Sequence, residues 1–160
     1  MSAISEKIDI PSNVTKSVEE VFGTMLNLPA EPLDGIGTED NGERVSGTIG
    51  IVGENVSGTL YLHLTAPLAR KAASAMLGMT EEELGDGQEV SDVVGEVTNM
   101  VCGNLKSALC DLDLPCAMST PAIIRGRQFR VEAAPGLDRF SVWFASASQP
   151  FCVEVHLKDT

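Results

Sequence analysis

The sequence predicts an α+β domain in which a largely antiparallel sheet packs against a few helices. Helical periodicity dominates two separated stretches, residues 12–28 and 89–111, whereas β-forming runs come in neighbouring pairs. The β-α-β alternation typical of a parallel sheet does not extend along the chain. Its 160 residues, 43% of them hydrophobic, suffice for one compact domain over residues 1–160.

The first half is expected to contain a helix, a hairpin and a shorter helix. Apolar residues recur at helical spacing behind Ser12, a candidate N-cap. Two β-rich runs flank Gly53-Glu54 and predict a hairpin, and Pro67 suits the first turn of a helix that Gly78 would end. The expected ranges are 12–28, 44–52, 55–65 and 67–78, with a Pro- and Gly-rich connector at 29–42.

The second half is expected to begin with a loop and a long helix and to end mostly in strands. Residues 81–88 are acidic with two glycines and predict a loop, while residues 89–111 are the longest periodic segment. Beyond Pro121, β-rich runs alternate with turn residues at Gly126, Pro135-Gly136 and Pro150. The expected strands are 122–124, 128–133, 140–147 and 151–158.

A faint internal repeat relates the two halves. Placing Ser12 over Ser91 superimposes the first predicted helix on residues 91–107, and predicted strands follow each helix. The identical positions are few. The pattern predicts two pseudo-equivalent helix-plus-hairpin halves.

Composition argues against several classes of function. The formal charge of -12, from 11 basic and 23 acidic residues, has the wrong sign for neutralising nucleic-acid phosphates. It fits docking to a basic patch on a partner protein and equally fits a solvated surface. We find no leader-like segment and no apolar run of membrane-spanning length, so a soluble cytoplasmic protein is expected. Without a C-x-x-C pair or clustered histidines, no metal site of its own is predicted.

Polar residues recur at offsets of three and four along the helix predicted over 89–111, opposite its apolar stripe. They are Asp92, Glu96, Asn99, Gly103 and Lys106. This spacing places all of them on one outer face, where a single partner could contact them. For most helices such a stripe is only the solvated side.

Two features weaken that ordinary interpretation. Asn99 is a poor helix former, and Gly95 and Gly103 each cost about 0.8–1 kcal/mol relative to alanine in an exposed helix interior. Small residues beside Glu96 and Asn99 would let the backbone of another molecule approach closely. We therefore expect Gly95 and Gly103 to contribute to partner binding.

The spacing Asp92-x3-Glu96-x2-Asn99-x21-Pro121 matches the pattern Asp/Ser-x3-Glu-x2-Asn-x21-Pro. In this the chain resembles the CheC, CheX and FliY phosphatases. Met76-Leu77-Gly78 is also similar to this family, and the likeness covers nearly the whole chain. It implies the CheC/CheX-like fold.

The internal repeat indicates which members of that family the chain resembles. CheC-like members carry two Glu-x2-Asn helices and CheX-like members carry one. Here Ser17 and Glu20 stand in the first helix where Glu96 and Asn99 stand in the second, so one site per chain is expected. FliY-like members add a flagellar-switch domain, for which 160 residues leave no space.

The resemblance implies hydrolysis of an aspartyl phosphate on a CheY-like response regulator that brings its own Mg²⁺. Asn99 would orient the attacking water, Glu96 would pair with the regulator's lysine, and Asp92 would tune docking. Pro121 would shape the chain entering the next strand. The resemblance also implies a homodimer, with sheet edges as candidate contacts.

Two alternatives stay open at this point. The main one is a non-catalytic module that binds response regulators or serves as a signalling scaffold on the same fold. A stand-alone enzyme for a small molecule ranks last, because we find no Gly-rich phosphate loop, Ser/His/Asp arrangement or metal cluster.

Overall fold

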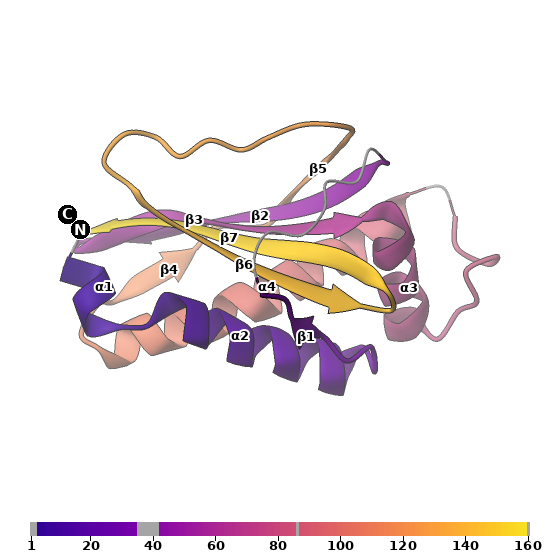
Figure 1. Cartoon of the computed structure of the whole chain (residues 1–160), viewed down its shortest axis with the longest axis horizontal. Coiled ribbons are helices and arrows are strands. Elements are labelled where there is room, and N and C mark those ends of the chain that lie inside the picture. The colour runs from indigo at the N-terminus through magenta and orange to yellow at the C-terminus, as the bar shows by residue number, and fades with distance from the viewer. Residues whose placement is uncertain (1–2, 35–41, 86, 160) are drawn as a thin grey trace.

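A computed structural model describes residues 3–34, 42–85 and 87–159 and shows one sheet with helices on one face (Figure 1). The helices are α1 Ala3–Lys7, α2 Ile10–Glu20, the π-helical turn η1 Val21–Met25, α3 Ala66–Leu77 and α4 Gln88–Asp111. The strands are β1 Glu31–Pro32, β2 Arg44–Gly53, β3 Val56–Thr65, β4 Cys116–Met118, β5 Ala122–Gly126, β6 Asp138–Ser146 and β7 Gln149–Asp159. No helix of the described residues is long and apolar enough to cross a membrane.

Every pairing in the sheet is antiparallel, which confirms the predicted fold class. The strand order is β1-β6-β7-β3-β2-β4, and β5 also pairs with β2. This order is symmetric about its centre. Hairpin β2–β3 occupies one side and hairpin β6–β7 the corresponding place on the other, and β4 and β5 lie at one edge as β1 lies at the other. In each half a helix is followed by an edge strand that pairs with the other half's hairpin. This symmetry agrees with the two pseudo-equivalent halves that the repeat predicts.

The core lies between the sheet and helices α2 and α4. Alternate residues of the central strands point to this side, as a half-buried sheet requires. Leu60 and Leu62 of β3 and Val153 and Val155 of β7 are fully buried there. Phe22 of η1 stacks on Phe151 of β7, with ring centroids 4.7 Å apart. Each fully buried side chain of this size stabilises the fold by about 1.5–3 kcal/mol.

The first long helix begins earlier than predicted. Asp9, and not Ser12, is its N-cap, because the Asp9 carboxylate accepts a hydrogen bond from the Ser12 backbone N–H at 3.1 Å. Pro11 lies in the first turn, where a missing N–H is harmless. Of the connector expected over 29–42, residues 35–41 lie outside the described residues.

The strand predicted over residues 128–133 is wrong. These residues belong to a covering loop, 127–137, which crosses the sheet face opposite the helices (Figure 1). Phe129 packs against Arg44 instead of entering a ladder, with the guanidinium carbon 4.2 Å from the ring centroid. β4 was not predicted, because it has only three residues. Pro150, expected as a break, lies within β7, because Ala147 and Ser148 make the turn with positive φ.

Candidate functional site

Helix α4, which carries the candidate residues, sits closely on strand β2. Most of its predicted apolar stripe is buried, and Thr98 faces Gly47 of β2. A Cβ added at Gly47 would overlap the Thr98 Oγ1 and lie 2.9 Å from the Thr98 Cβ. Thr98 donates its hydroxyl proton to the Val94 carbonyl at 2.6 Å, so this buried oxygen is satisfied. This close contact fixes the position of α4 relative to the sheet.

The predicted polar line faces outward from α4. Asp92 and Glu96 are exposed, and Asn99, Gly103 and Lys106 are half-buried. Asp92 accepts a hydrogen bond from the Gln88 side-chain amide at 2.7 Å. Among the described residues, neither Glu96 nor Asn99 has a side-chain hydrogen bond or ion pair. One carboxylate and one carboxamide, a turn apart, thus keep their full hydrogen-bonding capacity for another molecule.

Pro121 lies beside this line although 21 residues separate it from Asn99 in the sequence. After α4 the chain returns along the helix, so that a Cβ added at Gly95 would lie 3.5 Å from the Pro121 ring and 3.8 Å from Ile123. Gly95 is therefore buried under its own chain, and the expectation that it lies in an exposed helix interior is wrong. Gly103 is half-buried, and a Cβ there would reach only Met118, at 4.0 Å.

In α2, the position that the repeat superimposes on Glu96 does not face outward. Ser17, which the repeat superimposes on Glu96, is buried and faces α4. It donates to the Val101 carbonyl at 3.1 Å and accepts from the Asn104 amide at 2.8 Å. Buried residues of α2 match buried residues of α4 when the superposition moves by one position, which places the exposed Lys16, and not Ser17, over Glu96.

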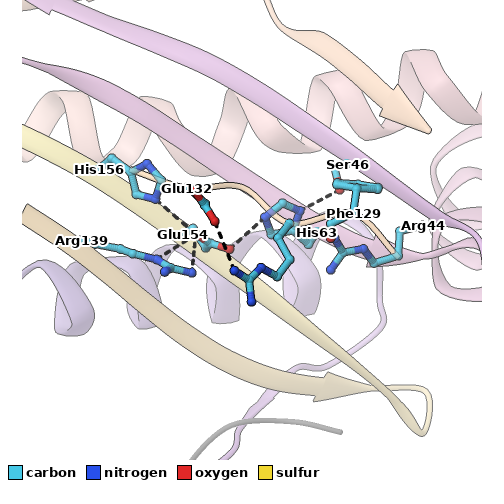
Figure 2. A network of polar contacts seen from close by, with 9 residues as sticks. Arg44, Ser46, His63, Phe129, Glu132, Arg139, Glu154 and His156 are labelled. Carbon is cyan, nitrogen blue, oxygen red and sulfur yellow. Dashed lines mark hydrogen bonds and ion pairs between the residues drawn. The ribbon is translucent and has the colours of Figure 1, made fainter. Parts of the chain in front are cut away.

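A second group of polar residues lies on the other face of the sheet, beneath the covering loop. Figure 2 shows His63, His156 and Arg139 converging on the Glu154 carboxylate. Both histidine Nε2 atoms and the guanidinium lie 3.2–3.3 Å from its oxygens. We call these four residues the Glu154 cluster. The sequence placed the two histidines on strands, but only the register brings His63 of β3 beside β7.

The Glu154 cluster joins a mostly buried carboxylate to three basic side chains. Its carboxylate side chain is 11% exposed, and the two histidines are buried. Burial opposes ionisation of Glu154, but its contacts with His63, His156 and Arg139 together outweigh burial and lower its pKa to about 2. The His63 ring also bonds to Ser46 through Nδ1 at 2.7 Å, whereas its Nε2 meets Glu154 at ion-pair distance without hydrogen-bond geometry. In residues 3–34, 42–85 and 87–159, no group of three or more His, Cys, Asp or Glu side chains could hold a metal ion.

Solved structures share the complete architecture described above. The chemotaxis protein CheX from Vibrio vulnificus is 28% identical with a TM-score of 0.81, and the alignment covers 95% of this chain and 98% of that one. CheX from Desulfovibrio desulfuricans is 27% identical with a TM-score of 0.78, and coverage is 94% and 100%. A CheX–CheY–BeF3–Mg²⁺ complex from Borrelia burgdorferi contains the same fold at 21% identity, a TM-score of 0.72 and coverage of 92% and 96%. No curated protein matches the chain.

The fold and the helix-mounted polar line define a protein of the CheC/CheX/FliY class. The model of the family described as chemotaxis phosphatase CheX matches residues 45–154, which include α4 and all of its outward polar line. The chain belongs to the CheX family of chemotaxis phosphatases.

Proposed function

We propose that this protein hydrolyses the aspartyl phosphate of a CheY-like response regulator in the cytoplasm, with Glu96 and Asn99 as its catalytic residues. The observation that carries the proposal is that both side chains face outward from one side of α4, unpaired among the described residues. Family membership supports it, as does the CheX from Borrelia burgdorferi that was crystallised with CheY, BeF3 and Mg²⁺. Beryllofluoride stands in for the phosphoryl group in that complex.

The chemistry suits an amide and a carboxylate. Hydrolysis of an acyl phosphate needs a water in line with the breaking P–O bond, and positioning plus electrostatics supply most of the rate. The Asn99 carboxamide can accept a hydrogen bond from that water through its oxygen and donate one to a phosphoryl oxygen through its nitrogen. An amide does not titrate, so Asn99 is neither nucleophile nor general base, and no covalent intermediate forms on this chain.

The other residues of the line position the regulator. Glu96 pairs with the regulator's lysine and sets the register of the helix, through a charge-assisted hydrogen bond. Asp92 lies one turn earlier and adjusts docking at the rim of the contact. Gly103 leaves the stretch of the line between Asn99 and Lys106 free of a side chain, and Pro121 packs on Gly95 and so shapes the flank. Mg²⁺ belongs to the regulator, and the protein acts as a homodimer.

The test is the decay of phosphorylated CheY-like regulators from the same organism. Wild-type protein should accelerate decay, and Asn99→Ala should reduce the acceleration about 10²–10³-fold while binding persists, as for loss of one transition-state hydrogen bond. Glu96→Ala should raise the concentration for half-maximal rate about tenfold or more. Glu20→Ala, an exposed glutamate on α2, is the charge-matched control.

Each other outcome has a clear meaning. Binding of regulators without acceleration by the wild type would refute the enzyme and favour the scaffold. Full activity of a folded Asn99→Ala protein would refute the water-positioning role. Absence of both binding and acceleration, across all regulators of the organism, would remove the regulator as substrate.

A further inference from the structure

Arg125 of β5 joins the first turn of α4 to the edge of the sheet. Its Nη2 donates to the Gly87 carbonyl at 2.7 Å and to the Ser91 hydroxyl at 2.9 Å, and its Nε reaches the same hydroxyl at 3.2 Å. Its Nη1 lies 3.3 Å from a carboxylate oxygen of Glu43, just before β2. All three guanidinium nitrogens are therefore engaged within the chain.

The start of α4 needs such external support. Gly87 is the N-cap with φ 117°, and no side chain caps the helix. A cation near a helix N-terminus opposes the helix dipole, and glycine is a weaker cap than serine or aspartate. Helix stability alone would favour serine or aspartate in place of Gly87 and no cation in place of Arg125. The arrangement instead fixes where the helix begins relative to β5.

The fixed turn leads directly into the proposed site. Ser91 precedes Asp92, and Gln88, next to Gly87, donates the hydrogen bond that holds the Asp92 carboxylate. In the same strand region, Pro121 and Ile123 lie against Gly95, one turn further along the helix. β5 and the residue preceding it thus contact α4 at two successive levels, both on the flank of its outward polar line.

We propose that Arg125 is a positioning residue of the phosphatase site, acting through Gly87 and Ser91 to hold the docking end of α4 in register. The inference rests on the proposed function of α4. Arg125 fixes the turn before Asp92, whereas Asn99 lies two turns further along the helix, next to Thr98, which packs on Gly47. Loss of Arg125 therefore weakens docking more than turnover. A direct contact with the regulator is not required, since its nitrogens are occupied.

The test compares Arg125→Ala with Arg130→Ala, which removes the same charge from the covering loop, where Arg130 is 79% exposed. Arg125→Ala should raise the KM for phosphorylated regulator about tenfold and change kcat less than about twofold. This is the effect expected when misplacement of the first turn of α4 costs docking about one charged hydrogen bond to the regulator. Arg125→Lys should recover part of the loss, because a lysine reaches fewer of these acceptors. Arg130→Ala should behave as wild type.

Ser91→Ala separates positioning from direct contact. It leaves every charge in place and removes a partner of Arg125, so it should raise KM in the same direction and add little to Arg125→Ala in the double variant. Amide hydrogen exchange of residues 91–94, the first hydrogen-bonded amides of α4, should increase in Arg125→Ala and Ser91→Ala and stay unchanged in Arg130→Ala. Unchanged exchange in Arg125→Ala, or a KM effect shared by Arg130→Ala, would overturn the inference. If wild type does not accelerate decay, the proposed function fails, while the exchange measurement still decides whether Arg125 holds the helix.

Discussion

Replacing Gly47 by alanine tests how closely α4 must sit on the sheet. An added Cβ would lie 2.9 Å from the Thr98 Cβ and overlap the Thr98 hydroxyl. Two carbon atoms rest at about 3.5–4.0 Å from each other. Strand and helix must therefore separate by roughly 0.6–1.1 Å, even after the hydroxyl turns away.

This separation should lower the free energy of unfolding by about 1–3 kcal/mol, the usual range for an overpacked core. Because Asn99 follows Thr98 directly, the same displacement moves the proposed catalytic amide, and a shift of about 1 Å can reduce a rate about 10²-fold. Urea unfolding measures the first effect. Regulator dephosphorylation at a temperature well below the unfolding transition measures the second. Gly50→Ala is the matched control on the same strand, since its Cβ would lie 3.4 Å from the nearest atom, the Ser119 hydroxyl oxygen.

A Gly47→Ala protein as stable as the Gly50→Ala protein would refute this reasoning. Adding Thr98→Ala should restore only part of the stability, because it removes the hydroxyl overlap and leaves the 2.9 Å contact between the two Cβ atoms. Loss of stability with full activity would show that the position of Asn99 does not depend on this contact.

Two further predictions concern groups away from α4. The pKa of Glu154 is lowered from 4.5 to about 2, so its carboxylate stabilises the fold above about pH 4.5, and this contribution is lost as the pH falls towards 2. Glu154→Gln should therefore flatten the acid limb of stability measured by urea unfolding, and an unchanged acid limb would contradict the charge network. Burial raises the pKa of the Cys102 and Cys152 thiols to about 12, so an alkylating reagent at mildly alkaline pH should leave both unmodified in the native protein. Peptide mass mapping that finds either one alkylated before unfolding would show that the core opens at that point.

Much of the local structure could be predicted because it depends on short-range patterns. The period of apolar residues in 89–111 reproduces α4 to within one residue. The hairpin predicted around Gly53-Glu54 also forms, with its turn one residue later, at Glu54 and Asn55. The outward line from Asp92 to Lys106 follows from helical geometry alone. The predictions were wrong where residues are held by partners far away in the sequence. Phe129 is β-forming by type but is held on the sheet face by Arg44, and Gly95 is covered by Pro121.

The sequence by itself determined the fold class, the face of α4 that bears Glu96 and Asn99, and the resemblance that the family match confirms, because these depend on residue type and spacing along the chain. Only the tertiary structure decided which residues support that face. Three contacts join residues far apart in the chain. Thr98 packs on Gly47, Arg125 bonds to the first turn of α4, and His63 lies against Glu154. Such contacts arise from strand register and helix packing, and no local pattern encodes them.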